Sequence, residues 1–104
     1  MKNLVIKRNA ESVAKVIGKG KFRVGAIKKD GTFTIREASV NPRLMAKLAT
    51  GRGQRNTNPD THFLFVDLKE NDFRMFLLEN IVFVETAHQF AAFDDSPLGE
   101  LGVR

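Results

Sequence analysis

The stretch that most constrains the fold runs from Lys21 to Arg36, KFRVGAIKKDGTFTIR, and has the pattern of a β-hairpin. Apolar residues recur at every second position on both sides of its centre, which is the period of a half-buried strand. At the centre, Asp30-Gly31 tolerates the positive φ angles of a tight turn. We therefore expect two antiparallel strands with one apolar face and one face of cations and hydroxyls. The residues expected on the core side are Phe22, Val24, Ala26, Phe33 and Ile35.

Two short helices are predicted on either side of this hairpin. Asn9 has the position of an N-cap and Gly18 that of a C-terminal stop for a helix over residues 10 to 17. Asn41-Pro42 is a second helix start, and that helix should run to about Thr50. Their apolar stripes are Val13, Val16 and Ile17 in the first helix and Leu44, Met45 and Leu48 in the second.

Further strands are predicted over residues 3–8, 62–68, 73–78 and 81–85. Residues 62–68 are nearly all apolar and fit a strand buried on both faces, whereas residues 86–93 are expected to form a short helical turn that packs Phe90 and Phe93 on the sheet. Short strands at this spacing predict a mostly β protein with two short helices, of the α+β class, arranged as a small antiparallel barrel or sandwich.

The length of 104 residues fits one domain, which we expect to span residues 1–93, followed by a flexible acidic tail over residues 94–104. Residues 51–61 are polar and rich in glycine, and they predict a long exposed loop. The chain has no cysteine and no apolar run near the roughly 20 residues that span a bilayer. It also lacks the pattern of a secretory signal. A cytoplasmic location is therefore expected.

The net charge of +5 conceals a strong asymmetry along the chain. Residues 1–59 hold 14 basic and 3 acidic residues, and residues 60–104 hold 3 basic and 9 acidic residues. Such a division indicates either a basic face directed at a polyanion or pairing between the two halves of the chain. Both interpretations stay open at the level of sequence.

The order of several short motifs resembles the WYL-like family of Sm-like, SH3-type β-barrels, which is found mainly in bacteriophage genomes. The resemblance covers about residues 21–85, with Met45 and Phe73 standing where the family usually has Gly and Tyr. It implies a barrel fold and a phage origin, hence the cytoplasm of a host cell, and it implies no catalytic residues. The residues that carry it are Ile27 to Thr32, Arg43-Leu44, Lys47-Leu48, Gly51, Gly53, Asn58-Pro59-Asp60, Asp67 and Phe73-Arg74.

The candidate binding site consists of basic residues in and around two glycine-containing turns, Gly18 to Lys21 and Gly51 to Arg55. Cations and free backbone N–H groups in such turns suit phosphates, which predicts contacts with the backbone of DNA or RNA. The alternative interpretation is that glycine and cations there only cap helices. The predicted nucleic-acid-binding residues are Lys19, Lys21, Arg23, Lys28, Lys29, Arg43, Lys47, Arg52 and Arg55.

All nine aromatic residues are Phe, and most fall in the apolar phase of a predicted strand, so we expect them in the core. Phe22 and Phe73 have basic neighbours and are the two candidates for stacking on bases.

Catalytic and metal chemistry find little support. His62 and His88 lack a second ligand at helical spacing, and no cofactor is predicted. Asp67 and Asp72 flank a turn and either form a carboxylate pair or stay solvated or paired with Lys69 or Arg74. The predicted function is therefore non-enzymatic. It is nucleic-acid binding or, as the alternative, docking on a host or phage protein through a sheet edge or a groove.

Overall fold

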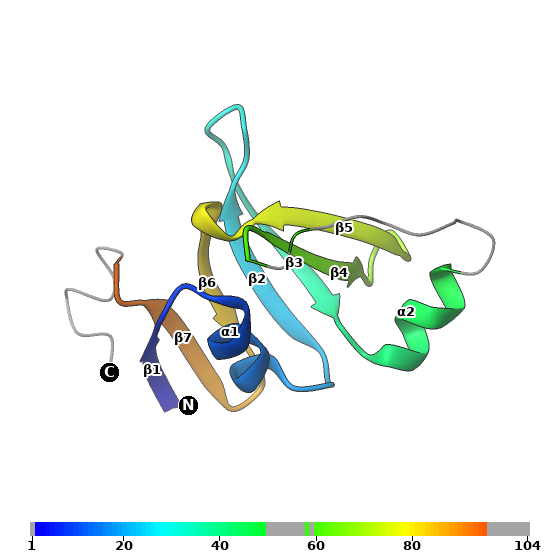
Figure 1. Ribbon diagram of the computed structural model, residues 1–104, viewed down its shortest axis with the longest axis horizontal. Coiled ribbons are helices and arrows are strands. Elements are labelled where there is room, and N and C mark those ends of the chain that lie inside the picture. Colours follow the sequence, from blue (N-terminus) through cyan, green and yellow to red (C-terminus); the bar gives the residue numbers. More distant parts are fainter. Residues whose placement is uncertain (1, 50–57, 59, 96–104) are drawn as a thin grey trace.

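The computed structural model describes residues 2–49, 58 and 60–95, and it contains one bent β-sheet with two short helices (Figure 1). This confirms the predicted mostly β, α+β class. The elements in chain order are β1 (Lys2–Ile6), α1 (Ala10–Ile17), β2 (Phe22–Ile27), β3 (Phe33–Ser39), α2 (Pro42–Ala49), β4 (His62–Asp67), β5 (Asp72–Leu77), the 3-10 helix η1 (Leu78–Asn80), β6 (Ile81–Glu85) and β7 (Gln89–Phe93).

The seven strands follow the order β1-β7-β6-β2-β3-β4-β5. Strands β2 to β6 pair antiparallel, but β1 runs parallel to β7. The expectation of a closed antiparallel barrel is therefore wrong for the described residues, because β1 and β5 form two separate edges and the sheet is mixed and open. The sheet is mixed because residues 89–93 form a strand that pairs with β1 in parallel at one end of the sheet.

The core lies on the inner side of the bend, where α1 covers the sheet (Figure 1). Val13, Val16 and Ile17 of α1 are buried there, which confirms the predicted stripe. They pack with apolar side chains from both ends of the sheet, including Phe65 of β4 and Phe93 of β7. A single core thus joins the two halves of the chain.

The hairpin forms as predicted, but its register differs from the expectation. Phe22, Val24 and Ala26 are buried, whereas Phe33 and Ile35 are each 50% exposed. Because Ile27 lies opposite Phe33 and Val24 lies opposite Arg36, the odd-numbered residues of both strands share the outer face. The five-residue connection from Lys28 to Thr32, closed by the hydrogen bond from Lys28 N to Thr32 O, determines which residues of β3 face outward.

Residues 89–93 form strand β7 and not the expected helical turn. Hydrogen bonding to β6 on one side and β1 on the other satisfies the backbone of this segment. Phe93 is buried, as expected, while Phe90 lies on the outer face and stacks on Phe83 with ring centroids 5.1 Å apart.

Both helices begin where their caps predict. The Asn9 side chain accepts a hydrogen bond from Ser12 N at 2.8 Å, and Asn41 Oδ1 accepts one from Arg43 N at 3.0 Å. No residue of α2 is fully buried, so its apolar residues are only half-covered. Neither helix in the described part of the chain has the length and apolar character needed to cross a membrane.

Arg8 ties the two ends of the domain together. Its Nη1 donates to the carbonyl oxygens of Leu78 and Ile81 at 2.6 Å, its Nε donates to Asp95, and its guanidinium lies 4.1 Å from the ring centroid of Phe93. Asp94 N also donates to Ile6 O at 2.9 Å. The first two residues of the predicted tail therefore contact the domain, and residues 96–104 lie outside the described residues.

Substituting Gly25 tests the packing of the outer face. A Cβ at Gly25 would lie 2.8 Å from Phe83 Cδ1 and closer still to Cε1, so the ring of Phe83 has to move. We expect Gly25→Ala to lower the free energy of unfolding in urea by about 1–3 kcal/mol, the usual effect of overpacking. Gly20→Ala is the control because nothing lies within 4 Å of its added Cβ. Equal effects of both variants would contradict this packing.

The Arg8–Asp95 contact predicts a pH dependence. The hydrogen bond from Arg8 lowers the pKa of Asp95 below its ordinary value. A carboxyl with a depressed pKa in the folded state stabilises the fold above its unfolded pKa, and this contribution is lost as the pH falls through the folded pKa. The side chain is 52% exposed, so the effect is small and weakens with salt. The difference in unfolding free energy between wild type and Asp95→Asn, measured at low salt, should shrink from pH 7 to pH 3. A difference that stays constant would contradict the prediction.

Candidate nucleic-acid interface

A surface groove lies between the turn after α1 and the start of α2. Two of the residues that line it are lysines and none is acidic, so its electrostatic potential favours anions. Its lining residues are Lys19, Gly20, Lys21, Ser39, Asn41, Leu44 and Leu68, and we call it the α2 groove.

Local hydrogen bonds position both walls of the α2 groove. Gly18 ends α1 with a positive φ of 59°, which glycine adopts without strain, and its N–H donates to Ala14 O at 3.1 Å. On the opposite wall, Ser39 Oγ accepts from Asn41 N at 3.1 Å, and Asn41 in turn caps α2. The lysines therefore stand on a defined turn beside a defined helix start.

Helix α2 adds two more cations beside the groove. Arg43 and Lys47 are one helical turn apart, both are exposed, and they share one face of α2. Leu44, Met45 and Leu48 are half-buried on another face of the helix, which packs against β4 and β5. The amphipathic pattern thus directs the cations to solvent.

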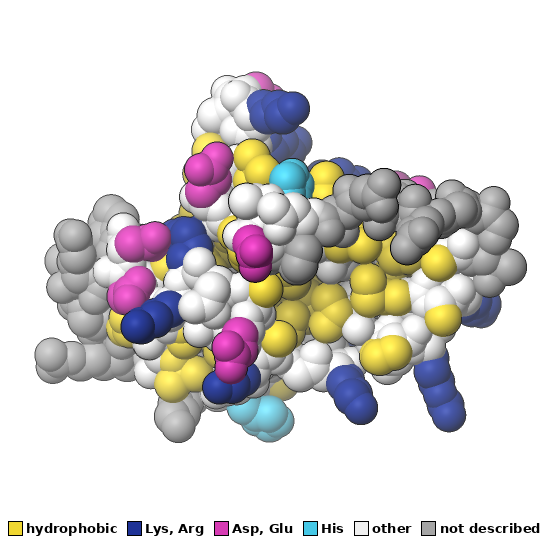
Figure 2. Space-filling model, in the orientation of Figure 1, with side chains coloured by type: hydrophobic (Ala, Val, Ile, Leu, Met, Phe, Trp, Pro, Cys, Tyr) yellow, Lys and Arg dark blue, Asp and Glu magenta, His cyan; other side chains and the backbone are white. Residues whose placement is uncertain are grey.

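The other predicted site residues lie elsewhere. Lys28 and Lys29 are exposed at the tip of the protruding β2–β3 hairpin, and Figure 2 shows separate groups of basic side chains at this tip and along the edge that carries α2. Arg52 and Arg55 fall outside the described residues. Lys19 and Lys21 therefore line the α2 groove, and Arg43 and Lys47 stand on the helix whose Leu44 lines it. The hairpin tip lies at the other end of β2 and β3.

Ion pairs between the two halves of the chain cancel part of the charge asymmetry. Arg8 pairs with Asp95 at 2.9 Å, Arg23 with Glu85 at 3.8 Å, and Arg36 with Asp67 at 3.7 Å. Arg23 also lies 4.0 Å from Glu37 and is thus flanked by two carboxylates. By contrast, the four cations at the α2 groove have no ion-pair partner among the described residues.

Phe22 is one of the two candidates for stacking on bases, but its side chain is only 3% exposed and lies in the core, where we expect most of the aromatic residues. Phe73 is half-buried on β5. The rings on the outer face are instead Phe33, Phe83 and Phe90, with neighbouring centroids 6.2 and 5.1 Å apart. Sequence reasoning missed them because the register of the hairpin decides which rings face outward.

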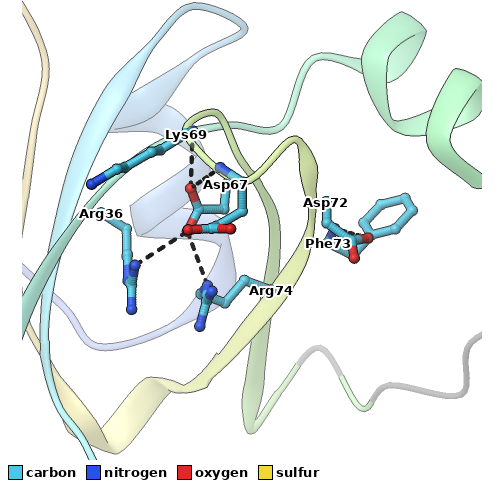
Figure 3. Close-up of polar contacts among 7 residues, drawn as sticks. Arg36, Asp67, Lys69, Asp72, Phe73 and Arg74 are labelled. Atoms are coloured by element: carbon cyan, nitrogen blue, oxygen red, sulfur yellow. Dashed lines mark hydrogen bonds and ion pairs between the residues drawn. The ribbon is translucent and has the colours of Figure 1, made fainter.

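The buried carboxylate of Asp67 is the centre of a polar cluster (Figure 3). It is 1% exposed and accepts hydrogen bonds from Arg74 Nε at 3.0 Å, Lys69 N at 3.0 Å and Glu70 N at 3.1 Å. This confirms pairing with Arg74, one of the alternatives considered. Arg36 is a second cation in the cluster, and its Nε is buried without a hydrogen-bond partner among the described residues. The cluster fastens β3, β4 and β5 together.

The histidines do not form a metal site in the described part of the chain, where no group of three His, Cys, Asp or Glu side chains converges. His62 Nδ1 instead lies 2.6 Å from Thr61 Oγ1.

Comparison of this chain with protein-family models, with curated proteins and with solved structures gives no match.

The Asp67 cluster predicts a large stability loss when its carboxylate is removed. Asp67→Asn leaves Arg36 and Arg74 facing a neutral side chain, and removing one partner of a buried pair typically costs about 3–5 kcal/mol. Urea unfolding should show a loss in this range. Glu79→Gln is the matched control because it removes one negative charge from an exposed position. A loss no larger than that of the control would show that the cluster does not hold the strands.

Proposed function

We propose that this protein binds the phosphate backbone of a nucleic acid, DNA or RNA, through the α2 groove. The contacting residues are Lys19 and Lys21 from the turn after α1 and Arg43 and Lys47 from α2. The observation that carries the proposal is that Lys19 and Lys21 line one groove that has no acidic lining residue, beside the start of α2. These two lysines, Arg43 and Lys47 have no ion-pair partner among the described residues, while three arginines of the same half of the chain are paired with acids.

The chemistry of the α2 groove suits backbone contacts better than base readout. Lysine is a point charge on a flexible stem, and it binds phosphate without fixed geometry. Each phosphate that a cation neutralises releases counterions, which makes the affinity depend on salt and not on sequence. No step of this function is catalytic or requires a cofactor.

An Sm-like, SH3-type arrangement of β2 to β6, within a sheet that stays open, is the finer fold assignment that we propose. It is supported by five consecutive antiparallel strands, β2 to β6, that bend around one core and follow a short helix. In this assignment β1 and β7 are additions at one edge. The alternative function, docking on another protein, is favoured by the exposed apolar residues of the outer face.

Salt dependence is the first test of nucleic-acid binding. Four phosphate contacts should lower the affinity by about a hundredfold between about 50 and 200 mM salt, since log K falls by about 0.9 per contact for each tenfold rise in salt. Fluorescence anisotropy with single- and double-stranded DNA and RNA oligonucleotides measures this slope. No binding at the lower salt concentration would overturn the proposal.

Matched variants locate the contacts. Lys19→Gln combined with Lys21→Gln should weaken binding and reduce the salt slope by about 2. Lys7→Gln combined with Lys15→Gln is the control, because these lysines line a different groove, beside β1 and α1, and Lys15 is paired with Glu11 at 3.4 Å. If both double variants changed the slope equally, binding would depend on net charge and not on the α2 groove.

A further inference from the structure

The outer face of the β2–β3 hairpin carries large apolar side chains that no described element covers. Phe33 and Ile35 are each 50% exposed and Ile27 is 38% exposed. They lie next to one another because Ile27 is opposite Phe33, and Ile35 follows Phe33 on the same side of β3. Phe83, which rests over Gly25, extends this surface towards β7. Apolar residues scattered singly over a surface need no explanation, whereas a contiguous apolar surface indicates an interaction site.

The same residues form a strand edge without a partner in the described part of the chain. Strand β4 pairs with β3 only at Ala38 and Ser39, and a last hydrogen bond joins Leu68 N to Glu37 O. Because Glu37 directs its carbonyl away from β2, strand alternation directs the N–H and C=O groups of Phe33 and Ile35 to the same side. This stretch therefore offers hydrogen-bonding groups and apolar side chains at one place.

We propose that β3 pairs antiparallel with β3 of a second copy of this chain, which forms a two-fold symmetric dimer. The register that makes the edge self-complementary places Thr34 opposite Thr34 of the second copy. Phe33 of each copy then exchanges two backbone hydrogen bonds with Ile35 of the other. The aromatic and β-branched side chains of these residues meet on the outer face, which is a favourable cross-strand combination.

The charges around this face fit a second copy better than a nucleic acid. The cations Arg23, Lys28 and Lys29 on β2 and the turn are balanced by the acids Asp30, Glu37 and Glu85. A polyanion would meet Glu37 and Glu85 beside the rings, whereas a second copy brings charges of both signs to the rim of the interface. The aromatic row Phe33, Phe83 and Phe90 is therefore assigned to protein contact and not to base stacking.

Sedimentation velocity of the full chain, from micromolar to submillimolar concentration, tests the dimer. The wild type should show concentration-dependent dimerisation, and Ile35→Lys should weaken it at least tenfold. Met75→Lys is the matched control, because Met75 is a 43% exposed apolar residue on β5, which β4 separates from β3 in the strand order. It should dimerise like the wild type. Circular dichroism establishes that both variants keep their strands.

A wild type that stays monomeric at every concentration would overturn the proposal, as would a dimer that Ile35→Lys leaves intact. A monomer whose affinity for single-stranded oligonucleotides falls in Phe33→Ala would also overturn it and assign the face to base stacking.

Disulfide trapping tests the register independently of affinity. The chain has no cysteine, so Thr34→Cys introduces a single thiol. Opposed Cα atoms of a non-hydrogen-bonded antiparallel pair are about 4.5 Å apart, which is within the range of a disulfide. Thr32→Cys is the control, because its two copies would be separated by about 13 Å along the paired strands. Mild oxidation should cross-link Thr34→Cys and not Thr32→Cys. Equal cross-linking of both, or none at Thr34→Cys, would overturn this register.

Discussion

The buried carboxylate of Asp67 is the constraint on which the curled half of the sheet depends. A charge removed from water is stable only when its lone pairs are occupied, and here two backbone N–H groups and Arg74 occupy them. Arg36 has to point to the inner side of β3 to reach the same carboxylate. Three neighbouring strands are therefore fixed by one group, and a shift of any of them by one residue would break the cluster.

This inward arginine also accounts for the unusual outer face. Successive side chains of a strand alternate, so Arg36 inside requires Ile35 and Glu37 outside, and Phe33 follows the same phase. Phe33 and Ile35 thus face away from the core that their hydrophobicity would favour. Neighbouring β2 adapts with Gly25, whose missing side chain leaves room for the ring of Phe83. The exposed surface is the geometric consequence of a buried ion pair.

Local features of the fold could be predicted from sequence, because each rests on a few adjacent residues. The Asn9 cap, the Asn41-Pro42 start and the Asp30-Gly31 turn all occur where their chemistry places them. Pairing and register could not be predicted, because they depend on contacts between distant residues such as Lys2 with Gln89. The site shows the same division. The basic residues could be identified from the sequence. The ion pair between Arg23 and Glu85, and the position of Lys21 and Asn41 in the same groove, depend on how the chain folds.

The two proposed surfaces are compatible because they occupy opposite ends of the same hairpin. The α2 groove is built at Lys21 and Ser39, where β2 begins and β3 ends, whereas the apolar edge lies at Ile27 and Phe33, beside the turn. Pairing of two β3 edges would leave both grooves open. A dimer would then present two weak phosphate-binding sites, and binding at the first raises the effective concentration at the second when a strand is long enough to span both. A chain with only four grouped cations gains most from such an arrangement, because each site alone neutralises few phosphates.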